Sequence, residues 1–397
     1  MPDARRPETD LQHLGEDRAS GGPAAPPLYQ TSTFTFPSWA DIETAFDDRT
    51  EAFLYSRLGN PTVRLAEQKL AALAGGERAR LFASGMAAIS AAILSCVDAG
   101  DHVVAVRNVY GPASNLLEGY LSQKMGLGVT FVGGEDPAEF DSAIGDQTRL
   151  VYLESPSSSV FGLQDVAAVA RVARARGIRT VIDNTWATPL YQKPLAMGVD
   201  LEVHSVSKYL GGHSDLVGGA VIASAEAMGA LAVAEGELLG ATMPPFEAWL
   251  LLRSLRTLPV RMRQHEASGL QVARFLEEHA AVRRVLHPGL ESHPQHELAR
   301  RQMVGTTGLL GFDLATDDLA RVRAFVDALD VFGLGVSWGG HESLVYAPAI
   351  SAARELPPER FAELGVAAGT VRISVGLEHP DDLVADLDQA LRHVSAP

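Results

Sequence analysis

The feature that most constrains the fold is an alternation of short apolar segments with segments of helical periodicity between residues 63 and 206. The short segments are apolar along their whole length, which is typical of strands buried on both faces. Because parallel strands need long connections, usually helices, this pattern predicts an open α/β fold with a mostly parallel sheet. The expected strands are 80–84, 101–106, 128–133, 149–155, 179–183 and 199–206, and the expected helices are 63–74, 86–97, 114–125 and 165–176.

The regions on either side of this alternation have a different character. Residues 1–60 are rich in Pro, Gly and Thr, and we expect an N-terminal arm or loop that lies on another surface. Residues 61–245 form the expected large domain. Beyond them the pattern changes to long helical stretches, chiefly 246–279, and then to a mixed segment and a final helix. This change predicts a smaller C-terminal α/β domain over 246–397.

Composition favours a small molecule as the partner. The 397-residue chain carries a formal net charge of -16 and has no long basic run, which disfavours nucleic acid and anionic membranes as partners. Cys96 is the only cysteine, so an intrachain disulfide and a thiolate-based metal site are both excluded. We find no secretory signal and no membrane-spanning run, and we expect a cytoplasmic protein.

Two predicted strand ends carry residues suited to binding charged groups. The first strand ends near Ser84, and Gly85 and Met86 open the next helix, where exposed amides and the helix dipole favour a phosphate. An ordinary strand-to-helix turn is the alternative. The strand 179–183 ends on Asp183, a carboxylate that needs a cationic partner or several donors if it is buried. It could cap the next helix, pair with an arginine or hold a protonated ring nitrogen.

Lys208 is one of only four lysines and follows the predicted strand 199–206 directly. Most lysines are solvated surface charges, but burial lowers the pKa of a lysine and makes its neutral amine available for a Schiff base. Open α/β sheets bind ligands at the carboxyl ends of their strands. An anion site, a buried carboxylate and a reactive amine at one edge match the phosphate, ring nitrogen and aldehyde of pyridoxal phosphate.

One competing motif contains the same lysine. Ser205 and Lys208 satisfy the S-x-x-K pattern of penicillin-binding enzymes, in which Ser205 would be the nucleophile. Those enzymes also need S-D-N and K-T-G, whereas Asp215 is followed by Leu216 and no lysine precedes Thr-Gly. This difference argues against a serine acyltransferase. The histidines of 287–296 lack a recognised ligand spacing, and we predict no metal.

A series of ordered motifs resembles the Cys/Met metabolism family of pyridoxal-phosphate enzymes, the group that contains cystathionine gamma-synthase and the cystathionine lyases. The resemblance covers nearly the whole chain and implies the type I fold of the pyridoxal-phosphate-dependent aminotransferases. It also implies a homotetramer, a dimer of dimers in which active sites are shared between subunits. The motifs are "LYQTSTF", "YSRLGNPT", "FASGMAA", "VYGPA", "ESPSSS", "DNTWATPL", "SKYLGGHSD", "LRTLPVRMRQH", "SWGGHESL" and "RISVGLE".

The resemblance implies a role for each candidate site residue. Lys208 would form the Schiff base with the cofactor and then act as base at the substrate α-carbon, and Asp183 would pair with the ring nitrogen. Tyr110 would stack on the ring and assist proton transfer, unless it is simply an aromatic core residue. Arg372 would hold the substrate carboxylate through a two-pronged contact. The other cofactor-binding candidates are Gly85, Met86, Ser158, Ser205 and Ser207, with Tyr55 and Arg57 from a neighbouring subunit, and the other substrate-binding candidates are Ser337, Trp338, Val336 and His341.

The motifs favour carbon-sulfur β-elimination of cystathionine or a related amino acid. Trp186, Ser158 and Trp338 resemble bacterial cystathionine beta-lyase. Val336 and His341 depart from it, because the beta-lyases usually have Tyr at the first position and the second is commonly aromatic. Val336 cannot hydrogen-bond the far end of cystathionine, so elimination or replacement at a γ-carbon, for example in a γ-halogenated amino acid, stays open. A non-catalytic regulatory protein that binds pyridoxal phosphate is a further alternative.

Overall fold

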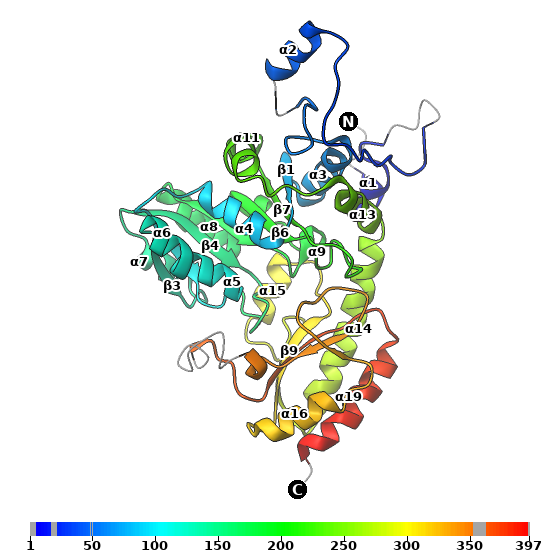
Figure 1. Cartoon of the computed structure of the whole chain (residues 1–397). Coiled ribbons are helices and arrows are strands. Elements are labelled where there is room, and N and C mark those ends of the chain that lie inside the picture. The colour runs from blue at the N-terminus through cyan, green and yellow to red at the C-terminus, as the bar shows by residue number, and fades with distance from the viewer. Residues whose placement is uncertain (1–4, 17–21, 48, 50, 352–362, 396–397) are drawn as a thin grey trace.

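The computed structural model describes residues 5–16, 22–47, 49, 51–351 and 363–395. A seven-stranded sheet organises the first part of the chain and a five-stranded sheet the second (Figure 1). The fold therefore has the large and small α/β parts that the sequence predicts. The domain boundaries near residues 60 and 245 stay a prediction.

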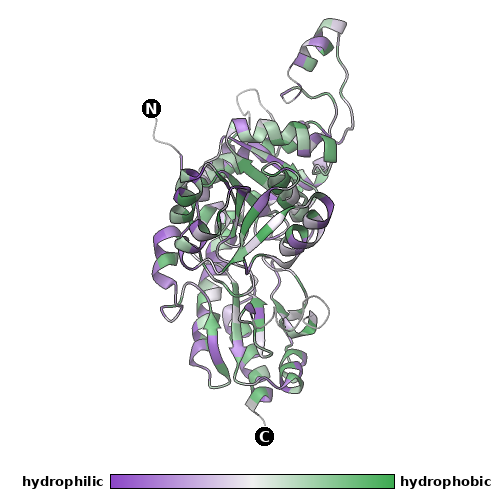
Figure 2. Cartoon of the chain, turned by 90° about the vertical axis from the view of Figure 1, so that its left-hand side faces the viewer, coloured by the Kyte–Doolittle hydropathy of each residue, from purple (hydrophilic) through white to green (hydrophobic). Residues whose placement is uncertain are grey.

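The large sheet has the strand order β1-β7-β6-β5-β4-β2-β3, and only β7 runs antiparallel to its neighbours. Six strands therefore point the same way, and their carboxyl ends meet at one edge of the sheet. The apolar runs that predicted these strands gather in the interior of the body (Figure 2). The strands are β1 (Arg78–Phe82), β2 (His102–Val106), β3 (Gly128–Val132), β4 (Thr148–Glu154), β5 (Arg179–Asp183), β6 (Leu201–Ser205) and β7 (Gly219–Ala223).

Helices of the first part pack against this sheet through their apolar residues. α3 contacts β1 and β7, α4 contacts β6 and β7, and α8 contacts β5. The predicted helix 114–125 exists but includes a π-helical stretch, η1. The helical elements are α3 (Pro61–Ala74), α4 (Gly85–Leu94), α5 (Gly111–Ser114), η1 (Asn115–Leu121), α6 (Ser122–Met125), α7 (Pro137–Ala143), α8 (Val166–Ala175), α9 (Thr188–Tyr191), α10 (Pro194–Met197), α11 (Ala225–Leu231), η2 (Ala232–Gly236) and α12 (Glu237–Leu239).

The second part is built on the smaller sheet, whose strand order is β10-β11-β12-β9-β8. The long helical stretch predicted over 246–279 is two helices, which separate at Arg256 and Thr257 just before Pro259. A separate apolar core joins α14, α16 and α19 to this sheet. The elements are α13 (Pro245–Leu255), α14 (Leu258–Glu278), β8 (Val282–Leu286), α15 (His296–Gln302), β9 (Leu309–Leu314), α16 (Leu319–Asp327), β10 (Gly333–Leu334), β11 (Leu344–Tyr346), β12 (Thr370–Ser374) and α19 (Pro380–Ser395).

The N-terminal region contains more structure than the expected arm or loop. Helix α1 (Pro7–His13) packs on α3, and its Leu11 is only 1% exposed. Lys69 on α3 donates a 2.9 Å hydrogen bond from Nζ to the Leu11 carbonyl. Helix α2 (Trp39–Asp47) stands away from the body, with Trp39 79% exposed (Figure 1). The expectation of unpacked chain is therefore wrong for α1, whose one buried leucine is too weak a periodic signal to predict a helix.

In the part of the chain that the structure describes, no helix is both long and apolar enough to cross a membrane. Within those same residues no group of three or more His, Cys, Asp and Glu side chains could hold a metal ion.

Gly219 on β7 provides a test of the sheet packing. It pairs with Phe82 on one side and Ser205 on the other. A Cβ at Gly219 would lie 2.2 Å from the Ser84 carbonyl oxygen, which cannot move without shifting the start of α4. We therefore expect Gly219→Ala to lower the free energy of unfolding by about 1–3 kcal/mol, as overpacked cores do. Urea unfolding followed by circular dichroism measures this change.

Gly229→Ala is the matched control, because a Cβ at Gly229 on α11 would meet nothing within 4 Å. Alanine is the better helix former, so this variant should keep or slightly raise the stability. Equal stability of the Gly219→Ala variant and the wild-type protein would contradict the close approach of β7 to Ser84.

Candidate active site

Lys208 lies directly beyond β6, at the edge where the carboxyl ends of the parallel strands meet. Its Nζ donates a hydrogen bond to Ser337 Oγ and lies 5.4 Å from the centre of the Trp338 ring. Burial, and after it the nearby charge of Arg372, lower the pKa of Lys208 to about 8, while Asp183 acts in the opposite direction. The neutral fraction of this amine at physiological pH is therefore larger than that of an ordinary lysine.

Asp183 ends β5 next to β6, and its side chain is buried. Its Oδ1 accepts two hydrogen bonds, from Thr185 N at 2.9 Å and from Thr185 Oγ1 at 2.5 Å. Burial raises the pKa of Asp183, and the bonds from Thr185 and the charges on His204 and Lys208 oppose that rise. Within the described residues no hydrogen bond reaches Oδ2, so this oxygen is available to a cationic ligand.

The start of α4 forms a second part of this edge. Ser84 Oγ accepts a 3.0 Å bond from Ala87 N, whereas Gly85 and Met86, at the first two helical positions, have no intrahelical acceptor for their amides. A Cβ at Gly85 would lie 3.0 Å from both Cβ and Oγ of Ser205. Glycine thus lets the helix start approach Ser205 closely. This arrangement is a cradle of amides and a hydroxyl that suits an anion.

The Ser207 hydroxyl already takes part in hydrogen bonds within the protein. Its Oγ accepts a 3.0 Å hydrogen bond from Gly218 N. It also donates at 3.4 Å to the Gly218 carbonyl. Lys208 bonds to Ser337 and not to Ser205, which is a further argument against the S-x-x-K chemistry.

The second part of the chain supplies residues that approach the same edge. Arg372 on β12 donates a 3.3 Å bond from Nη1 to the Ser158 carbonyl, and its guanidinium lies 5.4 Å from the Tyr346 ring centre. Ser337 has a φ of 77°, a left-handed conformation that is uncommon for residues other than glycine. Trp338 is buried and packs edge-on against the Tyr209 ring. The loop between β10 and β11 of the smaller sheet thus contacts Lys208 directly.

Four candidates lie outside this cluster or at its rim. Arg57 donates a 2.9 Å bond to the Glu237 carbonyl on α12, and its guanidinium is 5.8 Å from the centre of the Tyr55 ring. Both are exposed, and their role in a neighbouring subunit stays a prediction. Val336 is 72% exposed, and the His341 ring pairs with Glu342 at 3.1 Å. Neither contacts Lys208 in the way that Ser337 does.

Glu154, which the sequence analysis did not select, belongs to the same edge. It ends β4 in register with Asp183 on β5 and accepts hydrogen bonds from the amides of Tyr110 and Ser158. The sequence does contain a signal for Glu154, because this carboxylate is the last residue of an apolar strand, as Asp183 is. Tyr110, at the start of α5, is itself 44% exposed.

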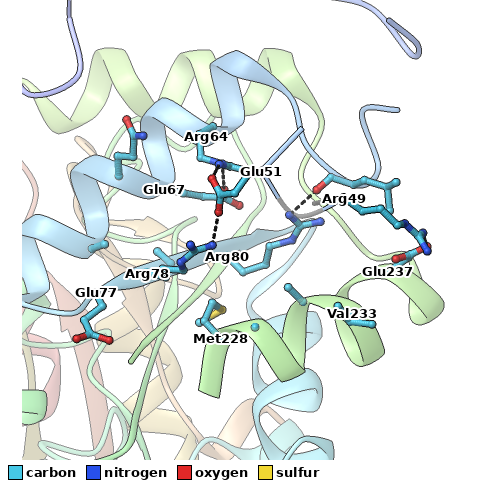
Figure 3. A pocket seen from close by; sticks show the side chains of 16 residues that line it. Arg49, Glu51, Arg64, Glu67, Glu77, Arg78, Arg80, Met228, Val233 and Glu237 are labelled. Atoms are coloured by element: carbon cyan, nitrogen blue, oxygen red, sulfur yellow. Dashed lines mark hydrogen bonds and ion pairs between the residues drawn. The ribbon is translucent and has the colours of Figure 1, made fainter. Parts of the chain in front are cut away.

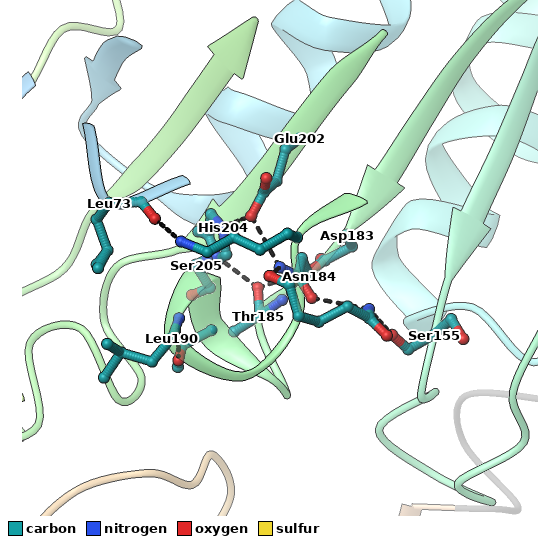
Figure 4. Close-up of polar contacts among 12 residues, drawn as sticks. Leu73, Ser155, Asp183, Asn184, Thr185, Leu190, Glu202, His204 and Ser205 are labelled. Atoms are coloured by element: carbon teal, nitrogen blue, oxygen red, sulfur yellow. Dashed lines mark hydrogen bonds and ion pairs between the residues drawn. The ribbon is translucent and has the colours of Figure 1, made fainter. Parts of the chain in front are cut away.

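A fully buried polar network lies behind this edge (Figure 4). Residues next to one another in a strand point to opposite faces, so Glu202 and His204 lie on the face opposite Asp183. Glu202 Oε1 accepts bonds from His204 Nε2 at 2.7 Å and from Asn184 Nδ2 at 2.8 Å. The network therefore ties the end of β5 to β6, which fixes the strand ends that carry Asp183 and Lys208.

A separate cavity of about 350 Å³, whose lining does not include Lys208, lies beside β1 (Figure 3). Four arginines and four glutamates line it, and they pair with one another, as Arg64 does with Glu51 at 2.6 Å and with Glu67 at 3.8 Å. Since these charges compensate one another, the cavity offers no distinct site for an anion or a cation.

The residues at the strand edge fit pyridoxal phosphate. The Gly85 cradle beside Ser205 suits its phosphate, the free Oδ2 of Asp183 suits a protonated ring nitrogen, and the amine of Lys208 suits its aldehyde. The sequence profile described as "Cys/Met metabolism PLP-dependent enzyme" matches residues 8–392. The chain belongs to this family.

Relatives with several activities are similar to this family member over nearly its whole length. An L-methionine gamma-lyase of Treponema denticola is 39% identical over 382 residues, which are 96% of this chain and 95% of the relative. A cystathionine beta-lyase of Lactococcus lactis subsp. cremoris is 37% identical, over 95% of this chain and 96% of the relative. The solved cystathionine gamma synthase from Xanthomonas oryzae pv. oryzae in complex with cystathionine is 36% identical, covers 99% of both chains and has a TM-score of 0.92.

These findings confirm the predicted family, fold and cofactor. The protein is a pyridoxal-phosphate-dependent enzyme of a family of carbon-sulfur lyases and synthases. β-Lyases, γ-lyases and a γ-synthase are similar to this chain to nearly the same degree. The comparison therefore does not determine which bond this enzyme breaks. The special similarity to beta-lyases stays a prediction.

The lowered pKa of Lys208 predicts how the apoprotein takes up its cofactor. Only a neutral amine attacks an aldehyde, and the neutral fraction rises as pH increases through the pKa. We expect the rate of reconstitution with pyridoxal phosphate to rise with a midpoint near pH 8, against 10.5 for an ordinary lysine. Stopped-flow absorbance at a series of pH values measures this midpoint.

Nα-acetyl-lysine in the same buffers is the control, because it reacts with the same aldehyde without the protein environment. A midpoint for the protein equal to that of Nα-acetyl-lysine would show that the Lys208 amine is not desolvated in solution.

Proposed function

We propose that this enzyme eliminates a thiolate from the β-carbon of an L-amino acid of the cystathionine type. The observation that supports the proposal is the amine of Lys208, half-buried between Ser337 and Trp338 at the edge that also carries Asp183. This amine has the reach and the lowered pKa of a base that acts at a bound substrate.

Five residues would hold the cofactor in this proposal. The amides of Gly85 and Met86 and the hydroxyl of Ser205 would bind its phosphate, Asp183 its ring nitrogen and Lys208 its aldehyde. Pyridoxal phosphate, when bound, supplies an electron sink that stabilises negative charge at the substrate α-carbon. Asp183 would strengthen that sink because its carboxylate favours the protonated form of the ring nitrogen.

The substrate would be oriented by Arg372 and deprotonated by Lys208. Arg372 presents a planar guanidinium suited to two parallel bonds with the α-carboxylate. Lys208 would take the α-proton, and the electron pair of that bond would form the α,β double bond as the β-carbon releases the thiolate. The Lys208 ammonium or the Tyr110 hydroxyl would protonate the leaving sulfur. Hydrolysis of the released enamine by water then gives pyruvate and ammonia.

The proposal includes the assembly of subunits. Tyr55 and Arg57 are exposed beside α12 within one chain, which is compatible with their use in the phosphate site of a second subunit. We propose a homotetramer in which each active site is completed in this way.

Elimination at the γ-carbon is the second candidate, and Val336 is the observation that favours it. Its side chain is 72% exposed and has no hydrogen-bonding group for the far amino or carboxylate group of cystathionine. The site would then suit an amino acid with a smaller or less polar γ-substituent. The same Lys208 amine would serve, because a second deprotonation at the β-carbon needs only a short movement of a flexible side chain.

A product assay separates the two candidates. With cystathionine as substrate we expect pyruvate and homocysteine from β-elimination, whereas γ-elimination gives 2-oxobutyrate and cysteine. Chromatography of the derivatised keto acids identifies the product, and Lys208→Ala should form neither. The absence of both keto acids from cystathionine and from γ-substituted amino acids, with the cofactor fully bound, would contradict an eliminating enzyme and favour a regulatory protein.

The Val336→Tyr variant refines the same assay. A hydroxyl that reaches the distal group of cystathionine should raise kcat/KM about fivefold, which corresponds to one added hydrogen bond. Val304→Tyr, at a position that is 84% exposed and outside the candidate site residues, is the control. Equal kcat/KM in the wild-type protein and both variants would show that Val336 is not part of the substrate site.

A further inference from the structure

Glu154 is a titratable group at the candidate active site to which neither the sequence motifs nor the proposed mechanism gives a role. It is the last residue of β4 and only 4% exposed. The register of β4 and β5 places it directly opposite Asp183. A carboxylate buried beside another carboxylate is costly, so its retention needs an explanation.

The two oxygens of Glu154 accept from two different loops. Oε2 accepts a 2.5 Å hydrogen bond from the Tyr110 amide, at the start of α5. Oε1 accepts a 2.8 Å bond from the Ser158 amide, in the loop that follows β4. Bonds from amides to an ionised carboxylate are stronger than those between neutral groups. One side chain therefore fixes two segments that lie more than forty residues apart in the sequence.

Each of these segments carries a group that the proposed mechanism uses. Tyr110 is the candidate that stacks on the cofactor ring, and its backbone position is set by the bond to Glu154. The Ser158 carbonyl accepts a 3.3 Å bond from Arg372, the candidate that binds the substrate carboxylate. Glu154 is thus linked to the ring-facing residue directly and to the carboxylate-binding residue through Ser158.

We propose that Glu154 is a positioning residue that aligns Tyr110 with the cofactor ring and Arg372 with the substrate carboxylate. This inference rests on the proposed function of those two residues. Glu154 itself need touch neither the cofactor nor the substrate.

The electrostatic surroundings of Glu154 agree with a functional role. Burial, and after it the charge on Asp183, raise the pKa of Glu154 to about 7, while the two amide bonds act to lower it. Arg372 lies on β12, and burial lowers its pKa while the charges of Tyr346, Tyr110 and Glu154 oppose that fall. A buried acid kept in such surroundings is more common at functional sites than in a structural core.

Glu154→Gln in the full-length holoenzyme tests the inference. The variant keeps the size of the side chain but replaces one accepting oxygen by an NH₂ group, which cannot accept from either amide. We expect KM for the eliminated amino acid to rise about tenfold, the effect of one lost charge-assisted bond. We also expect the visible circular dichroism of the bound cofactor to change, because the Tyr110 ring loses its fixed position.

Glu67→Gln is the matched control. Glu67 on α3 is also buried, accepts a 3.0 Å bond from a backbone amide, that of Leu81, and has a pKa raised by burial. It should lose stability in urea without a change in KM or in cofactor dichroism. Glu154→Asp, which keeps the charge on a shorter side chain, should fall between the wild-type protein and Glu154→Gln.

The outcomes are distinguishable. If Glu154→Gln loses stability as Glu67→Gln does but keeps the wild-type KM and dichroism, Glu154 is a structural residue and the inference is overturned. If Glu154→Gln does not fold, Glu154→Asp must show the raised KM and altered dichroism, and wild-type values in that variant overturn it. If the wild-type enzyme eliminates nothing, the proposed function fails, and a spectral titration with L-alanine, which has no leaving group, still compares amino-acid binding among the variants.

Discussion

The structure depends on one geometric constraint, the common direction of six strands in the large sheet. Strands buried on both faces tolerate apolar side chains along their length, so polar groups collect where the strands end. Because the strands run the same way, these ends meet at a single edge. Glu154, Asp183 and Ser205 are the last residues of β4, β5 and β6, and Lys208 follows three positions later. The common direction of the strands therefore determines where the candidate active site lies.

The charges at this edge depend on one another. Burial raises the pKa of Asp183 and of Glu154 and lowers that of Lys208, so in each case it favours the neutral form. Each group is opposed by specific partners, such as Thr185 for Asp183 and the amides of Tyr110 and Ser158 for Glu154. Hydrogen-bond donors of the protein, and not solvent, thus stabilise the carboxylates. In this environment an amine with a lowered pKa can coexist with a carboxylate that pairs with a ring nitrogen.

The sequence predicts the large sheet and its ligand edge well, because fully apolar strands separated by helices have few other solutions. It also identifies Asp183 and Lys208 as site candidates, because each is a charged residue at or just beyond the end of an apolar run. Residues that reach the edge from the second sheet, such as Ser337 and Arg372, have no local signal, and only the family motifs pointed to them. Glu154, in contrast, has a local signal that the sequence analysis did not use, because it is a carboxylate at the end of an apolar strand just as Asp183 is. Helix α1 was missed because its packing on α3 depends on a long-range contact of Leu11.

The most direct test of this account asks which lysine holds the cofactor. Borohydride makes the attachment of pyridoxal phosphate to an amine permanent, and the chain has only Lys69, Lys124, Lys193 and Lys208 as candidates. Peptide mapping by mass spectrometry of the reduced holoenzyme should find the modification on Lys208 alone. Modification of any of the other three lysines in place of Lys208, or a fully loaded protein that borohydride does not modify, would contradict the assignment of the active site to this edge of the sheet.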